Sequence, residues 1–170
     1  MGFNANEFRA NFSTGFARNN MFKVEIPNPP INFNTSALEF SCIASELPGK
    51  QIATAEYKDY GLVRKIPYGA IFDDASLEFL VDGQMTQKLF IDQWMEHIVD
   101  NTGSSDVEYY DNLNTNVIIT QFSPTGRVIY KIELEEAYPV SVEPLTLSWE
   151  TKDEIHRVRV SFAYRNWRRI

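Results

Sequence analysis

Strict alternation of apolar and polar residues runs through several segments of this 170-residue chain. In residues 127–136, RVIYKIELEE, apolar and aromatic residues alternate with lysine and glutamate. Side chains of a β-strand point alternately to its two faces, so a period of two predicts a strand with one face on a core and the other on polar surroundings. Four further segments share this pattern: 22–26, 76–82, 145–150 and 155–164.

Two other segments, 38–44 and 116–122, are expected to be strands with more continuous apolar character. The region 85–99 departs from the period of two, because apolar residues such as Phe90 and Trp94 recur there at helical spacing. That spacing predicts an amphipathic helix of about four turns. The fold class is therefore expected to be mainly β, an antiparallel β-sandwich or barrel of two sheets with one flanking α-helix.

The length favours a single domain, 1–170, because domains usually contain roughly 100–200 residues. Two stretches rich in turn-forming residues, at about 45–74 and 100–116, are interpreted as long loops. Loops of this length in a compact domain tend to be functional or to make interfaces.

The chain carries a formal net charge of −7, which argues against a protein that grips nucleic acid through its phosphates. The same charge is compatible with a protein that lies close to nucleic acid but must not bind it. The only cysteine, Cys42, cannot form an intramolecular disulfide and is interpreted as a small buried hydrophobic residue. We find no membrane segment, because no apolar run approaches the roughly 18–20 residues that a membrane span needs.

Catalytic chemistry has little support in the sequence. His97 and His156 lack the spacing of a metal site, and no phosphate-cradling loop or dinucleotide fingerprint is present, so no metal and no cofactor are expected. The adjacent acids Asp73 and Asp74 follow a Pro-Gly turn and could act as catalytic acids, hold a metal ion or form a charged corner. We favour the charged corner and expect no catalytic residues.

The C-terminal residues 165–170, RNWRRI, combine three arginines with a tryptophan. Such a segment can bind single-stranded nucleic acid, stay solvated or dock onto an acidic neighbour. Docking is favoured, because the rest of the chain is strongly acidic.

The ordered set of segments resembles the tail tube proteins of contractile-tailed phages of the T-even type, over nearly the whole chain. The segments that carry the resemblance are GFARNNMFKVEI (15–26), CIASELPG (42–49), RKIPYG and FDDASLEFLVDG (64–83), FIDQW (90–94), FSPTGRVIYKIELEEAYPVSV (122–142) and LTLSWETKDEIHRVRVSFAYRNW (145–167).

The resemblance implies a non-enzymatic structural subunit of the virion tail, assembled in the host cytoplasm. Six copies would form a ring whose strands join into a β-barrel, and rings would stack into a hollow tube. The implied partners are further copies of the chain, a contractile sheath protein, and baseplate and tail-terminator proteins. DNA would pass through the lumen without specific binding.

In this family the long loop after the second strand, here about 46–74, reaches the adjacent ring. The residues expected at contacts between rings or subunits are Leu47, Pro48, Tyr57, Tyr60, Arg64, Lys65, Asp73, Asp74, Arg165, Trp167, Arg168 and Arg169. Glu133 and Glu135 are candidates for the lumen, although the pattern leaves open whether they face the lumen or the outer wall.

Three other functions stay open at this point. The first is a baseplate ring that initiates the tube, or the inner tube of a phage-like machine that injects protein. The second is a soluble β-sandwich that binds a small ligand. The third is a hydrolase that uses Asp73 and Asp74.

Overall fold

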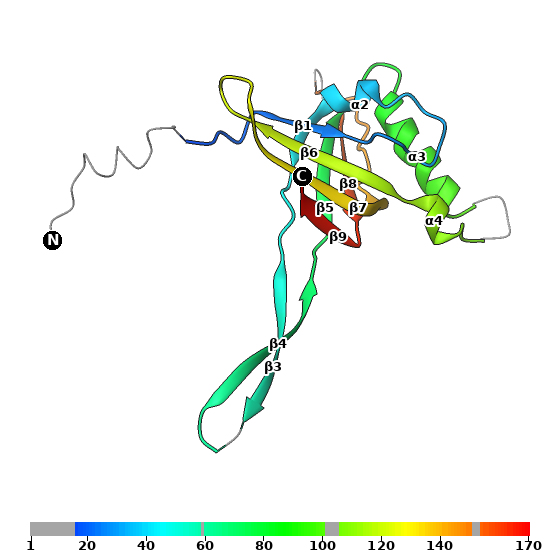
Figure 1. The fold of residues 1–170 in the computed structure, drawn as a ribbon. Helices are drawn as coiled ribbons and strands as arrows, with labels where there is room; N and C mark the ends of the chain where they lie inside the picture. The colour runs from blue at the N-terminus through cyan, green and yellow to red at the C-terminus, as the bar shows by residue number, and fades with distance from the viewer. Residues whose placement is uncertain (1–15, 59, 101–105, 151–153) are drawn as a thin grey trace.

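A computed structural model describes residues 16–58, 60–100, 106–150 and 154–170 (Figure 1). It contains a β-sandwich body and a long two-stranded hairpin that projects from it. All strand pairs are antiparallel, which confirms the mainly β fold class. The strands of the body are β1 (Phe22–Glu25), β2 (Cys42–Ser45), β5 (Ala75–Leu80), β6 (Thr115–Phe122), β7 (Val128–Val142), β8 (Arg157–Ala163) and β9 (Asn166–Arg169).

The long strand β7 belongs to both sheets of the body. Its first part pairs with β6 and β9, and β6 also pairs with β1, which forms one sheet. Its last part pairs with β8, which continues through β5 to β2 in the other sheet. One strand therefore joins the two layers of the sandwich.

A β-bulge near Glu136 marks the change from one sheet to the other. The register against β6 shifts between Thr115 and Val117, and Glu136 has a positive φ of 54°. The side chain of Asn116 fixes this point: its Oδ1 accepts the Glu136 N–H at 3.3 Å and its Nδ2 donates to Glu133 Oε1 at 2.9 Å. An extra residue on one strand bends that strand and increases its twist, which allows β7 to pass between the sheets.

The core lies between the two sheets. Alternate residues of the strands are buried there, as the period of two predicts. The fully buried ones include Leu77, Phe79, Val117, Ile119, Ile132, Leu134, Val158, Val160 and Phe162.

Helix α3 (Thr86–Ile98) covers the core and confirms the helix predicted at 85–99. The ring of Phe90 packs against that of Trp94, and the Trp94 ring lies 5.8 Å from the ring of Phe162 on β8. The Trp94 Nε1–H donates to the backbone oxygen of Leu113 at 2.8 Å. At the start of the helix, Asp82 Oδ1 accepts the Thr86 N–H, and this hydrogen bond is the main cause of a lowered pKa of Asp82.

Two strand predictions were wrong. Residues 38–41 belong to the short helix α2 (Ser36–Ser41), and β2 begins only at Cys42. The Asn34 side chain accepts the Ser36 N–H and favours the helical turn, and Phe40 is left largely exposed. Residues 145–150 form no strand in the described chain, since Pro144 has no N–H with which to extend the ladder from β7.

The loop predictions also need correction. Residues 45–74 contain two long strands, β3 (Gln51–Lys58) and β4 (Val63–Ile71), which pair with each other. Within 100–116, the described part contains the short helix α4 (Tyr110–Leu113) and the beginning of β6. The predicted strands at 22–26, 76–82, 116–122 and 155–164 are confirmed within a few residues of their ends. The strand predicted at 127–136 is also confirmed, but it continues to Val142.

Candidate assembly interfaces

The hairpin of β3 and β4, called the arm below, extends far from the body (Figure 1). Its pairing runs without interruption from Gln51 opposite Ile71 to Lys58 opposite Val63, apart from one bulge. Near the tip, Gly61 has a φ of 113°, a conformation that residues with a side chain rarely adopt. An isolated two-stranded hairpin has only marginal stability in water, so an arm of this length indicates that something packs against it.

Large apolar and aromatic side chains cover the arm, and none of those named here is less than 49% exposed. They are Ile52, Tyr57, Tyr60, Leu62, Val63, Ile66, Tyr68 and Ile71. Single exposed apolar residues are common on soluble proteins, but a continuous set of this kind marks an interaction site. The sequence placed Tyr57, Tyr60, Arg64 and Lys65 among the expected contacts, and the structure brings these four together on the arm.

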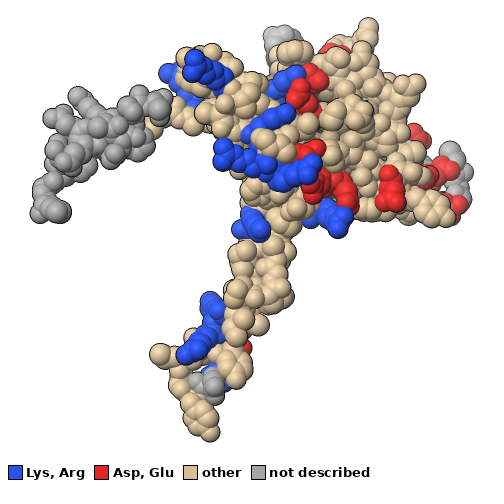
Figure 2. Space-filling view, viewed as in Figure 1, with Lys and Arg blue, Asp and Glu red and all other residues tan. Residues whose placement is uncertain are grey.

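The arm also carries positive charge toward its free end. Lys58, Arg64 and Lys65 lie in the half of the hairpin away from the body, together with one acidic residue of β3, Glu56, opposite Lys65. Figure 2 shows that basic side chains predominate there. The arm therefore combines an apolar surface with a basic tip, which favours an apolar partner surface with acidic residues at its border.

Asp73 and Asp74 lie where the arm returns to the body, between β4 and β5. Asp73 Oδ2 accepts a hydrogen bond from Gln51 Nε2 at 3.0 Å, across the base of the arm. Burial raises the pKa of the nearby Tyr164 hydroxyl, and the charges of the two aspartates add to that shift. Leu47, which was also expected at a contact, is half exposed on the connection from β2 to the arm.

The C-terminal segment docks onto the acidic part of β7, as the sequence predicts. Strand β9 places Arg168 opposite Glu133 and Trp167 opposite Leu134. Arg168 Nη2 lies 2.8 Å from Glu133 Oε2. Its Nε lies 3.1 Å from Glu135 Oε1, so one arginine pairs with both glutamates.

The other arginines of this segment also contact side chains of their own chain. Arg165 Nη1 lies 2.6 Å from Glu136 Oε1, and Arg169 lies over the ring of Tyr130. The hydrogen bond to Glu136 is the main cause of a raised pKa of Arg165. The predicted intersubunit role of these arginines therefore competes with ion pairs that a single chain already makes.

The acidic stripe at Glu133 and Glu135 is partly neutralised by the single charge of Arg168. The Glu133 side chain is only 12% exposed, beneath Arg168. The hydrogen bond that Arg168 donates to Glu133 is the main cause of a raised pKa of Arg168. The surface of the chain at Glu133 and Glu135 is therefore mixed in charge and not a bare row of carboxylates (Figure 2).

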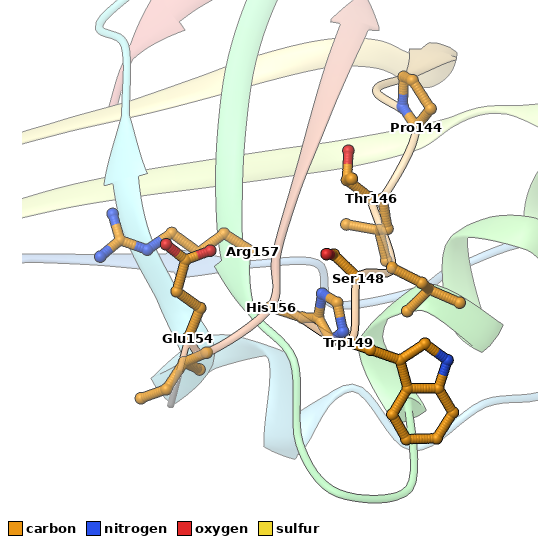
Figure 3. Close-up of a pocket in the computed structure, with 10 residues that line it drawn as sticks. Pro144, Thr146, Ser148, Trp149, Glu154, His156 and Arg157 are labelled. Carbon is orange, nitrogen blue, oxygen red and sulfur yellow. The ribbon is translucent and has the colours of Figure 1, made fainter. Parts of the chain in front are cut away.

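A second surface lies at residues 144–149 and 154–157, which line an open pocket of about 950 Å³, called the groove below (Figure 3). Just before the groove, the Glu143 N–H donates a hydrogen bond of 3.0 Å to the carbonyl oxygen of Arg159. The groove lies between the two segments beyond this hydrogen bond. Trp149 is fully exposed, and Leu147 and Ile155 are 82% and 68% exposed. The sequence pattern at 145–150 identified alternating apolar residues here but gave no sign that they would stay outside the core.

The structure does not bring together a catalytic set from His97, His156 and Cys42. His97 Nε2 lies 3.3 Å from the backbone oxygen of Asn112, and the backbone oxygen of His156 accepts the Val81 N–H. Burial raises the pKa of the Cys42 thiol to about 12, which disfavours the reactive thiolate.

In the described part of the chain, no cluster of three or more histidine, cysteine or acidic residues could hold a metal ion. Among the same residues, no helix has the length and apolar character to cross a membrane.

Comparisons with known proteins point to one family. The model of the phage tail tube protein family matches residues 4–170. The tail tube protein gp19 of Enterobacteria phage T4 is 28% identical, over 94% of this chain and 95% of that protein.

Solved structures show the same fold at lower identity. A chain of the sheath–tube complex of an extracellular contractile injection system, PVC, in the extended state has a TM-score of 0.67 and 15% identity, over 99% of this chain and 100% of that one. A chain of the anti-feeding prophage baseplate has a TM-score of 0.65 and 13% identity, over 91% and 95%. The chain belongs to the phage tail tube protein family, as the sequence predicts, and is a structural protein of the virion tail.

Proposed function

We propose that six copies of this chain close into a ring, and that the rings stack into a hollow tube through which DNA leaves the virion. The observation that carries this proposal is the arm, whose apolar side chains are exposed along its whole length in the single chain. Such a surface is a liability in a free protein and is explained by burial in an assembly.

Strand edges support closure into a ring. The outer edges of β1, β2 and β9 have no strand partner in the described chain, so each can pair with another copy. A cyclic arrangement that returns to its starting point uses every such edge and limits uncontrolled association. The proposed contacts between subunits or rings include Leu47, Pro48, the arm, the Asp73–Asp74 corner and the 165–169 segment.

The net charge suits a conduit for nucleic acid. A chain of charge −7 repels phosphates, so DNA can pass without being held. Glu133 and Glu135 are proposed to face the lumen. Since the single charge of Arg168 offsets only one of these two carboxylates, we expect this part of the wall to stay weakly acidic.

The proposed partners are a contractile sheath around the tube and the baseplate and terminator proteins at its ends. The role is structural, with no enzyme activity and no cofactor. Similarity to T4 gp19 over 94% of this chain favours the body of a phage tube over a baseplate initiator ring or the tube of a protein-injecting machine.

Negative-stain electron microscopy of the purified protein tests the proposal. We expect hexameric rings or hollow tubes, whereas a strictly monomeric particle at high concentration would contradict the proposal. The double substitution Asp73→Asn with Asp74→Asn separates assembly from catalysis. It is expected to change assembly at most, while a hydrolase would lose turnover with its particle form unchanged.

A further inference from the structure

We propose that the groove receives the arm of a second copy of this chain from the neighbouring ring. This inference rests on the proposed function, since it requires rings that stack. It adds the receiving surface, which lies at residues 144–149 and 154–157.

The arm and the groove lie at opposite ends of the same sheet. The arm returns to the body just before Ala75, which pairs with Phe162 on β8. The groove begins at the other end of β8, where Arg157 pairs with Leu80. The length of β5 separates these ends by about 17 Å, at about 3.4 Å per residue.

This arrangement has a consequence for assembly. A contact between two different surfaces at opposite ends of a subunit joins copies head to tail and repeats without limit. Stacking along the direction of the arm (Figure 1) would bring the arm of one copy toward the groove of the next. The same pair of surfaces can therefore act at every level of a tube.

The two surfaces match in apolar character. The groove presents Leu147, Trp149 and Ile155, all mostly exposed. The tip of the arm presents Tyr60 and Leu62, which are also mostly exposed. Contact between them would remove both sets from water, and tryptophan and tyrosine are the residues that most often dominate such contacts.

The charges match as well. Lys58, Arg64 and Lys65 outweigh Glu56, which lies opposite Lys65, so the described residues of the arm's outer half carry a net positive charge. Glu154 lines the groove and Glu150 follows its residue Trp149, and both are exposed. Arg157 also lines the groove, but it lies 3.7 Å from Glu78 of its own chain. Opposite charges on the two surfaces favour this pairing over contact between two arms, where like charges would meet.

The backbone of the groove is also suited to a further strand. Residues 144–149 and 154–156 belong to no strand, and only Arg157, the first residue of β8, does, although the alternating pattern of 145–150 is that of a strand. A hairpin from another chain can add main-chain hydrogen bonds to extended segments of this kind. We infer that residues 145–149 become a strand only when the arm of the neighbouring copy lies against them.

Complementation between two variants tests the inference. The arm variant carries Tyr60→Asp with Leu62→Asp, and the groove variant carries Leu147→Asp with Trp149→Asp. Each is expected to form single rings without tubes, because each lacks one of the two surfaces. Mixing them restores one intact arm and one intact groove, so electron microscopy should show stacks of two rings and no longer tubes.

Tyr109→Asp is the matched control, since Tyr109 is an aromatic residue with 83% exposure outside both surfaces. It should form tubes like the wild type. If the groove variant also forms tubes, or if the mixture gives single rings only, the inference is wrong while the proposed function stands. If the wild-type chain forms neither rings nor tubes, the proposed function fails and the inference fails with it.

Disulfide trapping gives a readout that does not depend on tolerance of the aspartates. In a Cys42→Ala background, Leu62→Cys and Leu147→Cys should form intermolecular disulfides on mild oxidation of assembled tubes, and a ladder of linked chains should appear under denaturing conditions. The matched control, Leu62→Cys with Val140→Cys, should give at least tenfold less product. Equal linking in both pairs would overturn the inference.

Discussion

The body and the arm are built from the same kind of strand, but they treat apolar residues in opposite ways. In the body, Leu77, Phe79 and Val160 are at most 1% exposed. On the arm, Tyr60, Leu62 and Tyr68 are at least 75% exposed. The body is completed by its own chain, and we infer that the arm is completed only by assembly.

The comparison shows what a strand pattern can and cannot specify. Alternation of apolar and polar residues gives a strand one apolar face. Whether that face is buried depends on which other segments of the chain pack against it. In the body, α3 and the opposite sheet cover the apolar faces. The arm leaves the body before any segment of the described chain covers it.

The largest effect on stability is expected for Trp94→Ala. Trp94 is fully buried and donates a hydrogen bond to Leu113, so its truncation leaves a cavity and an unpaired carbonyl group. We expect a loss of about 3–5 kcal/mol in the free energy of unfolding, measured by urea denaturation of the unassembled chain. The control Trp149→Ala, at a fully exposed tryptophan, should change it by about 0.5 kcal/mol or less. Equal losses would remove the distinction between core and assembly surface.

A smaller effect is expected where β7 passes between the sheets. Asn116→Ala removes both hydrogen bonds that fix the bulge, one to the Glu136 N–H and one to Glu133. The expected loss is about 1–2 kcal/mol in the same urea experiment. Asn166→Ala is the control, because Asn166 is exposed and its contact to Glu135 is long, at 3.5 Å. A loss as large at Asn166 would show that the bulge is not specially fixed.

The positive φ of Glu136 gives a finer test of the same bend. Glu136→Ala and Glu136→Gly both remove the ion pair with Arg165, but only glycine adopts a φ of 54° without a steric cost. We expect the glycine variant to be more stable by about 1 kcal/mol in urea denaturation. An alanine variant of equal or greater stability would contradict the left-handed conformation at this position.

The smallest effect on stability is expected on the arm. Tyr60→Ala should change the free energy of unfolding of the unassembled chain by about 0.5 kcal/mol or less, because Tyr60 is fully exposed. The same variant should form fewer tubes than the wild type in sedimentation assays. A loss of stability comparable to that of Trp94→Ala would mean that the arm packs on its own body.

The sequence predicted the body well, because its pattern and its packing agree. The strand at 76–82 and the helix at 85–99 each have an apolar face that meets the core, so period and burial give the same answer. Charge favours docking of the C-terminal arginines onto an acidic neighbour, but it does not specify that this neighbour is β7 of the same chain.

The rest depended on contacts that no local pattern specifies. The sequence predicts a loop at the arm because Pro67, Gly61 and Gly69 interrupt its alternation. A strand that no other segment of its own chain covers needs no regular apolar face. The sequence predicts a strand at 145–150 because the alternation there is regular, although this segment pairs with no strand in the described chain. The positive φ of Glu136 has no signal in its residue type.

Hydrogen exchange of the arm before and after assembly tests the central claim most directly. The amides of residues 51–58 and 63–71 should exchange rapidly in the unassembled chain and at least tenfold more slowly in tubes, while those of β5 and β8 should be protected in both states. Equal exchange of the arm in the two states would contradict the claim that assembly completes it.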